Sequence, residues 1–191
     1  MKSIVTLTTL LASFSLCACV TKPPLATVQT VDLERYAGRW YEIARYPNWF
    51  QRRCQSGAVA EYTPQRDGSI KVVNSCRDAG GVIRSITGRA TVVPHSGNAR
   101  LKVRFFGPFS GDYWIIGLDE RNYSWALVGH PSRRFLWILS REPIMNDKLY
   151  GRIIEIAVSK GYSAKSIERV SQAARRLADS SASFPTAHLR P

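Results

Sequence analysis

The chain is poor in the residues that catalytic and metal sites use most often. Its 191 residues include three histidines and four cysteines. His95, His130 and His188 are far apart and have no cysteine or carboxylate at ligand spacing, so the sequence predicts neither a metal site nor a haem site. It also lacks a Gly-x-Ser-x-Gly elbow, a phosphate-binding glycine-rich loop and a dinucleotide fingerprint. We therefore expect no cofactor and no enzymatic activity.

Long hydrophobic runs are absent as well. The N-terminal apolar run at residues 4–12 follows a single cation, Lys2, and is interrupted by threonines. A transmembrane helix needs about 20 predominantly apolar residues, and this run is too short. The layout is typical of a secretory signal, and we assign residues 1–18 to a signal peptide.

The end of this segment, Leu16-Cys17-Ala18-Cys19, resembles a bacterial lipobox, in which the peptidase cuts before a lipid-modified cysteine. An ordinary secretory cut after Ala18 is the alternative, but Leu16 is not the small residue that such sites require. We predict that Cys19 is the first mature residue and carries lipid, which would attach the protein stably to a membrane. Val20 follows Cys19 where aspartate could stand, which resembles outer-membrane sorting in enteric bacteria. The predicted location is the outer membrane, facing the periplasm.

Acidic residues are scarce relative to basic ones. There are 14 Asp and Glu against 27 Lys and Arg, which gives a formal net charge of +13. Such an excess favours nucleic acid or anionic lipid head groups as partners. Because an exported protein rarely meets nucleic acid, we expect a membrane partner and no nucleic acid. A merely soluble basic surface is the simplest alternative.

The four cysteines divide into two groups. Cys17 leaves with the signal peptide and Cys19 is assigned to lipid, so Cys54 and Cys76 remain in an oxidising compartment. We predict that they form a disulfide. Two buried free thiols are the alternative, and a metal site would need further ligands that are not nearby.

The rest of the chain alternates strand-length apolar stretches with turn residues, the pattern of antiparallel sandwiches and up-and-down barrels. The predicted strands are residues 40–46, 58–62, 70–74, 88–93, 101–106, 113–118, 125–128 and 135–140. Within residues 101–105, apolar and cationic side chains alternate strictly, which places one face toward an interior and one toward water.

Segments of other character flank these strands. Residues 32–38 predict one helical turn, residues 145–160 an amphipathic helix capped by Gly161, and residues 166–170 one last strand. Residues 19–30 contain Pro23 and Pro24 and are assigned to the lipidated N-terminus and a tether. The globular domain is expected at residues 31–170, and residues 171–191 form a basic tail that we expect to be mobile.

Four blocks resemble the lipocalin family, in particular its bacterial outer-membrane and apolipoprotein D-like members. The first is Gly-Arg-Trp-Tyr-Glu-Ile-Ala-Arg at residues 38–45, which contains the Gly-x-Trp signature. The others are residues 101–109, 111–114 and 136–141, in the family's order and spacing. This chain differs from bacterial relatives in its Cys54 and Cys76 pair and in its long basic tail.

The resemblance implies an all-β fold, an eight-stranded antiparallel up-and-down barrel with a C-terminal α-helix packed on it. It also implies that Arg141 lies across the Trp40 indole at the closed end, so the signature residues Gly38, Trp40 and Arg141 are expected to be structural. An eight-stranded barrel is wide enough for one small ligand.

Strand alternation predicts which side chains line that barrel, with ordinary core packing as the alternative for each of them. The candidate ligand-binding residues are Glu42, Leu101, Val103, Phe105, Tyr113, Phe135, Trp137 and Leu139. Glu42 has the parity of Trp40 and would need a polar partner if it faces inward.

By resemblance, the expected function is to bind, store or transport a hydrophobic ligand, a fatty acid or lysophospholipid, in the service of cell-envelope lipid maintenance. The alternative is a basic envelope adaptor whose surface docks to lipopolysaccharide, peptidoglycan or a protein partner. For the oligomeric state, a monomer and a homodimer are both compatible with the sequence.

Overall fold

The computed structural model describes residues 23–173. The predicted signal peptide, the lipidation of Cys19 and residues 174–191 of the predicted tail lie outside the described residues.

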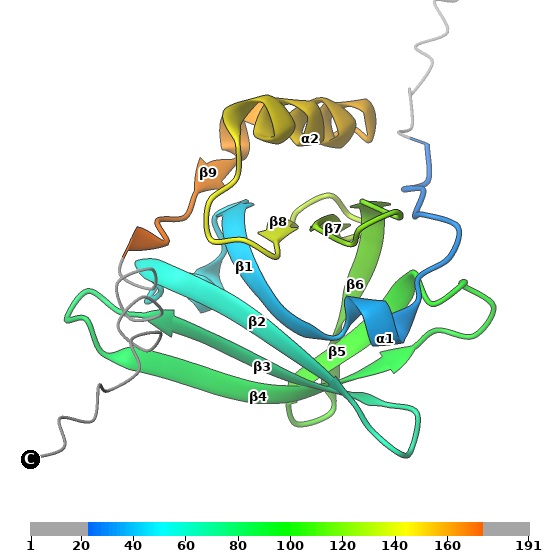
Figure 1. Cartoon of the computed structure of the whole chain (residues 1–191). Helices are drawn as coiled ribbons and strands as arrows, with labels where there is room; N and C mark the ends of the chain where they lie inside the picture. Colours follow the sequence, from blue (N-terminus) through cyan, green and yellow to red (C-terminus); the bar gives the residue numbers. More distant parts are fainter. Residues whose placement is uncertain (1–22, 174–191) are drawn as a thin grey trace, which may run out of the picture.

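Antiparallel strands form one sheet that closes into a barrel, as predicted (Figure 1). The strands are β1 (Gly38–Arg45), β2 (Ser56–Pro64), β3 (Ile70–Arg77), β4 (Ile83–Val92), β5 (Arg100–Phe106), β6 (Phe109–Leu118), β7 (Trp125–Gly129), β8 (Leu136–Ser140) and β9 (Glu168–Arg169). Each of β1 to β8 pairs with its neighbour in sequence, and β1 pairs with both β2 and β8. This closure leaves the eight strands without a free edge. The short β9 adds to β1 outside the barrel.

Within residues 23–173, four helical segments accompany the sheet: α1 (Leu33–Tyr36), the 3₁₀ turns η1 (Trp49–Gln51) and η2 (Ala164–Ser166), and α2 (Asp147–Ser159). Helix α2 begins where the Asn146 side chain accepts a hydrogen bond from the Lys148 amide, and Gly161, at φ 85°, follows its end. The helix lies across the outer face of the barrel (Figure 1). Its Ile153 and Ala157 are fully buried against that face.

Strand alternation divides the buried apolar side chains into two clusters. One fills the barrel interior and includes Trp40, Leu101 and Leu139. The other lies between the barrel and α2, and includes Ile138 and Leu136 from the outer face of β8. The same strands therefore supply both the inner wall of the barrel and the support for the helix.

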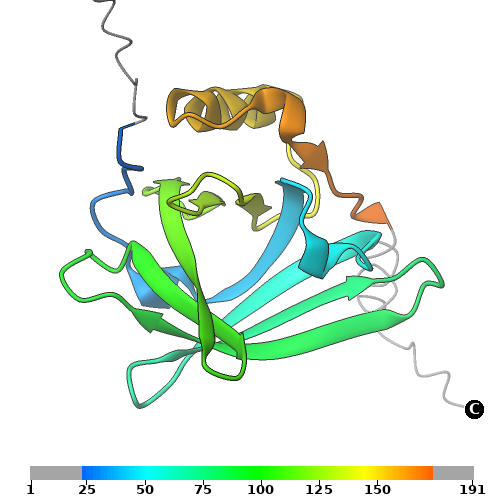
Figure 2. The same ribbon diagram turned by 180° about the vertical axis from the view of Figure 1, so that it is seen from behind.

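The two ends of the barrel differ. At the closed end lie α1 and the connections at residues 65–69, 93–99 and 119–124. At the open end lie the connections at residues 46–55, 78–82, 107–108 and 130–135, because successive antiparallel strands turn at opposite ends. The η1 turn and the β5–β6 hairpin, both of the open end, face the viewer in Figure 2.

Several segments differ from the sequence prediction, among them β6, which begins at Phe109 and not at the predicted residue 113. Strand β4 begins at Ile83, before the predicted residue 88, because its exposed first half is held by backbone pairing with β3 and not by an apolar face. In the predicted tether, Leu25 is buried and the Val28 amide donates to the Ile115 carbonyl, so this segment packs along the barrel. At the start of the predicted tail, Gln172 is buried and bonded to β1 and β2.

Candidate ligand-binding site

The floor of the barrel is built around Trp40 and Arg141. The Arg141 guanidinium lies 3.9 Å from the centre of the Trp40 ring, and the Trp40 indole donates to the Tyr36 carbonyl at 2.8 Å. Arg141 also donates to the carbonyls of Arg35, Ala37 and Arg39 at 2.7 to 2.9 Å. These contacts fasten α1 and the start of β1 across the closed end. Gly38, at φ 88°, makes the turn between them in a backbone conformation that favours glycine.

Three tyrosines form a polar cluster just above this floor. Tyr36 from α1 and Tyr62 from β2 both meet the Tyr113 hydroxyl on β6, at oxygen–oxygen distances of 2.7 and 2.9 Å. Burial raises the pKa of all three phenols above the usual value of 10.0. The three hydroxyl groups carry three hydrogens, and the two hydrogen bonds between them use two. The third hydrogen can therefore be donated to a further acceptor.

Six of the predicted wall residues lie on the inner face of the barrel, whereas Phe135 precedes β8 and does not belong to the interior cluster. Leu101 and Leu139 belong to the interior cluster, and Val103, Phe105, Tyr113 and Trp137 pack against it. Phe105 lies over Gly88 of β4, where a Cβ would come within 2.6 Å of the ring. Alanine at position 88 would therefore displace Phe105 from the wall.

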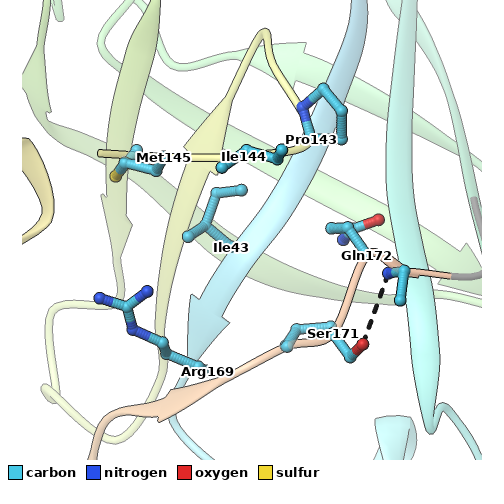
Figure 3. Close-up of a pocket in the computed structure, with 9 residues that line it drawn as sticks. Ile43, Pro143, Ile144, Met145, Arg169, Ser171 and Gln172 are labelled. Atoms are coloured by element: carbon cyan, nitrogen blue, oxygen red, sulfur yellow. Dashed lines mark hydrogen bonds between the residues drawn. The ribbon is translucent and has the colours of Figure 1, made fainter. Parts of the chain in front are cut away.

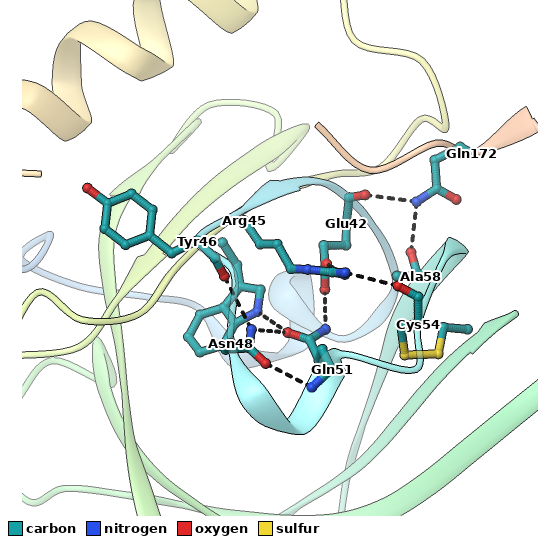
Figure 4. Close-up of polar contacts among 10 residues, drawn as sticks. Glu42, Arg45, Tyr46, Asn48, Gln51, Cys54, Ala58 and Gln172 are labelled. Atoms are coloured by element: carbon teal, nitrogen blue, oxygen red, sulfur yellow. Dashed lines mark hydrogen bonds and ion pairs between the residues drawn. A yellow bond between two sulfur atoms is a disulfide. The ribbon is translucent and has the colours of Figure 1, made fainter. Parts of the chain in front are cut away.

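Glu42 faces inward and is fully partnered by protein groups (Figure 4). It pairs with Arg45 at 2.6 Å and accepts from the Gln51 amide at 2.8 Å. The side-chain oxygen Oε1 of Gln51 in turn accepts hydrogen bonds from the Trp137 indole at 3.0 Å and from the Asn48 side-chain amide at 2.6 Å. Burial raises the pKa of Glu42, and Arg45 partly offsets that shift. The carboxylate thus holds η1 and Trp137 in place at the open end.

An aromatic series leads from this network out of the barrel. Trp137 stacks on Phe135 at 6.1 Å between ring centres, and Phe135 meets Phe50 at 5.7 Å. Phe50 in turn contacts Trp49 at 5.6 Å. The exposed surface fraction rises along the series to 50% for Phe50 and 72% for Trp49. The interior wall is therefore continuous with an exposed apolar edge at the open end.

The structure joins Cys54 and Cys76 by a disulfide, with their Cα atoms 5.4 Å apart. The bond links the connection that carries η1 to the end of β3. Because Arg45 also donates to the Cys54 carbonyl at 3.0 Å, the disulfide and the Glu42 network fasten the same loop.

Two of the hollows formed by the described residues lie outside the barrel. One, of about 240 Å³, is bordered by Ile43, Met145 and residues 169–173 (Figure 3). The other, of about 320 Å³, lies on the outer face of β4, β5 and β6 and is lined by Arg89, Lys102 and Arg104. Among residues 23–173 there is no group of three His, Cys, Asp or Glu side chains placed to hold a metal ion. No helix in the same range is long and apolar enough to cross a membrane.

A closed eight-stranded barrel, a floor closed by an arginine on a tryptophan and an apolar wall open at one end define a ligand-binding barrel. The comparison with known families agrees: the profile described as "Lipocalin-like domain" matches residues 31–172. The chain belongs to the lipocalin family, a family of non-enzymatic binding proteins.

Among its relatives, the chain is 36% identical over 165 residues to the outer membrane lipoprotein Blc of Vibrio cholerae, covering 85% of this chain and 96% of that protein. It is 38% identical over 160 residues to temperature-induced lipocalin-1 of Arabidopsis thaliana, covering 79% and 84%. The solved structure of insecticyanin from Manduca sexta superposes with a TM-score of 0.65 at 21% identity, covering 79% and 86%. The last likeness concerns the fold alone.

Sequence reasoning did not identify several residues of the site. Tyr62 and Tyr36 complete the tyrosine cluster, and only Tyr62 stands on a strand whose alternation could have pointed to it. Trp49, Phe50 and Gln51 belong to a turn that the strand pattern leaves as a loop. Their role depends on contacts with Glu42 and Trp137, far away in the sequence.

Proposed function

We propose that this lipocalin binds, stores or transports a single-chain lipid, a fatty acid or a lysophospholipid, in its barrel. The observation that carries the proposal is the apolar inner wall that continues through Trp137 and Phe135 to the open end. An acyl chain would gain about 0.8 kcal/mol for each methylene buried there. An anionic head would remain at the open end, where Arg52 and Arg53 are exposed.

We further propose that the protein works as a lipoprotein of the outer membrane, anchored through Cys19 and facing the periplasm, where it maintains envelope lipids. The lipobox at residues 16–19 and the similarity to outer membrane lipoproteins Blc support this assignment. The plant and animal relatives show that the family also serves in other settings.

Native mass spectrometry of the protein extracted from its own membranes tests both proposals. A mass increase equal to two or three acyl chains on Cys19, plus a removable lipid of defined mass, is the expected result. The same spectrum reads the oligomeric state and so decides between a monomer and the homodimer. An acylated protein with an empty barrel would contradict the carrier role and leave the anchor standing.

A variant in the wall tests the pocket itself. Trp137→Asp places a carboxylate on the inner face, so a folded Trp137→Asp protein should bind a fluorescent fatty acid far more weakly. Ile144→Asp is the matched control, because Ile144 is exposed on the connection between β8 and α2. If the aspartate prevents folding, Trp137→Ala asks the same question. Equal affinity in a folded Trp137 variant and the control would remove Trp137 from the site.

The basic hollow at Arg89, Lys102 and Arg104 favours a second candidate, an adaptor that docks an anionic envelope component through its surface. If the protein is such an adaptor, the unsubstituted chain binds lipopolysaccharide and does not bind a fatty acid. The double variant Arg89→Ala with Arg104→Ala should then lose the binding to lipopolysaccharide.

A further inference from the structure

The exposed apolar side chains of the molecule concentrate at the open end of the barrel. Eight large apolar side chains are exposed within residues 23–173, and six of them stand on open-end connections or the strand ends beside them. These six are Trp49 (72%), Phe50 (50%), Val82 (55%), Ile83 (54%), Phe106 (73%) and Phe109 (82%). They come from three separate connections, η1 and the β3–β4 and β5–β6 hairpins. The closed-end connections at residues 65–69, 93–99 and 119–124 carry none of the eight, and the other two, Ile144 and Val158, stand on the β8–α2 connection and on α2.

Charge separates the two ends in the same way. We define the mouth surface as residues 46–55, 77–84, 104–111 and 130–135. It contains seven arginines and a single acidic residue, Asp78, which is paired with Arg84. Counted over the connections alone, the open end contains four arginines and one acidic residue, and residues 65–69, 93–99 and 119–124 of the closed end contain two arginines and three acidic residues. Apolar side chains surrounded by cations suit the boundary between the head groups and acyl chains of an anionic bilayer.

The N-terminal end of the described chain lies at the same end of the barrel. The Pro23 carbonyl accepts a hydrogen bond from Arg133, in the β7–β8 connection, at 2.6 Å. Cys19 precedes Pro23 by four residues, which span at most about 14 Å when extended. A lipid on Cys19 would therefore hold the open end, and not the closed end, close to the membrane.

We infer that the mouth surface docks onto an anionic phospholipid bilayer, with Trp49, Phe106 and Phe109 inserted among the lipids. Two copies of the chain meeting mouth to mouth would bring fourteen arginines together against two acidic residues, so the charge favours lipid over a second copy. The series from Trp49 through Phe50 and Phe135 to Trp137 then joins the bilayer to the barrel wall. A ligand could pass between them without its acyl chain entering water. This route rests on the proposed function, whereas the docking takes from it only the lipid on Cys19.

The test follows Trp49 with the purified full chain and vesicles of phosphatidylethanolamine with and without phosphatidylglycerol. Lipids brominated on their acyl chains quench tryptophans that enter the bilayer. We expect quenching with anionic vesicles, and we expect Trp49→Phe to remove most of it. Trp40 and Trp137 pack in the barrel interior, and Trp114 and Trp125 pack against the cluster under α2. Two results would overturn the proposal. One is quenching that is unchanged in the Trp49→Phe protein, and the other is a chain that binds the vesicles without any quenching.

A second measurement uses Cys19→Ser in the full chain, so that an acyl anchor cannot hold the protein on the vesicle. Phe106→Ser combined with Phe109→Ser should weaken its vesicle affinity by about tenfold or more, since two aromatic side chains no longer leave water. The control pair Ile144→Ser and Val158→Ser removes exposed apolar side chains elsewhere and should have little effect. Equal losses in the two pairs would contradict the assignment.

Two further readings separate the outcomes. If the chain sediments as a dimer that Phe106→Ser with Phe109→Ser converts to a monomer, the mouth surface is an interface between copies and the docking proposal fails. If the mouth surface docks but native mass spectra show no barrel lipid, the docking stands and the proposed carrier role fails.

Discussion

At the scale of single residues, Arg141 shows how a family signature can be structural. Its guanidinium covers Trp40 and donates to the backbone carbonyls of Arg35, Ala37 and Arg39, which joins α1 to the start of β1. Charged hydrogen bonds contribute about 1.5–3 kcal/mol each and a cation on an aromatic ring about 0.5–2 kcal/mol. The role of Arg141 is therefore to hold the closed end together.

We predict that Arg141→Ala lowers the free energy of unfolding by about 3 kcal/mol or more and leaves the choice of ligand unchanged. Urea unfolding measures the loss of stability, provided that the dependence of the unfolding free energy on urea concentration is the same in both proteins. Competition between fatty acids for the folded protein measures the choice of ligand. Arg141→Lys should recover only part of the loss, because an ammonium lacks the planar fork that reaches several carbonyls. A stable Arg141→Ala protein with altered ligand preference would show that this residue belongs to the binding site.

The tyrosine cluster gives the protein a weakness at high pH. The pKa of each of Tyr36, Tyr62 and Tyr113 is raised by burial, so the folded state keeps protons that the unfolded chain has lost above pH 10.0. Stability is therefore fully present below about pH 10 and falls as the pH rises beyond it. Urea unfolding at increasing alkaline pH should show this fall. The fall should be less steep in Tyr113→Phe, and an equally steep fall would place its origin outside the cluster.

At the scale of elements, the strands were predictable and the mouth was not. Alternation places the inward residues of β5 and β8 correctly, because each strand buries one face regardless of its distant neighbours. The turn η1 and the exposed half of β4 carry no such pattern. They are fixed by the Glu42 network and by backbone pairing with β3, which depend on residues that meet only after the barrel closes.

The candidate site divides in the same manner. Trp137, Leu139 and Leu101 follow from their parity on strands. The partners of Glu42 do not follow from the sequence, since Gln51 reaches the carboxylate from a turn and Gln172 reaches the backbone of β1 from far along the chain. The contacts of the Tyr113 hydroxyl also depend on the register of the strands around the whole barrel.

The disulfide is the element that we expect to control the mouth. Replacing both cysteines, in Cys54→Ser with Cys76→Ser, should lower the free energy of unfolding by about 3 kcal/mol, the loop-entropy value for a separation of 22 residues. Urea unfolding of the oxidised protein, compared with the double variant, measures this. Hydrogen exchange should rise most at η1, because hydrogen bonds from Arg45 to the Cys54 carbonyl and from the Gln55 amide to the Arg77 carbonyl would then hold the Cys54 segment without a covalent link. Uniform exchange across the barrel would argue that the bond does not control the mouth.

At the scale of the whole molecule, two kinds of binding coexist on one barrel and respond differently to salt. The interior wall is apolar, whereas the mouth surface and the hollow at Arg89 carry a large excess of arginine and lysine. The free energy gained by burying an acyl chain is proportional to the apolar area removed from water and hardly depends on the ionic strength. Attraction between exposed cations and anionic lipids is screened over about 10 Å at 0.1 M salt.

We therefore predict that raising the ionic strength leaves the affinity for an uncharged lipid analogue nearly unchanged and sharply weakens binding to anionic vesicles. Both are measured on one preparation, the first by fluorescence competition with a monoacylglycerol and the second by vesicle sedimentation of the Cys19→Ser chain. Arg52→Gln with Arg53→Gln should flatten the salt response of vesicle binding, because two exposed mouth cations are then absent. If salt weakens both affinities alike, the lipid analogue is bound by the basic surface and the barrel is not the carrier. If salt weakens neither, apolar contact alone holds the mouth to the membrane and the excess of arginine there has another purpose.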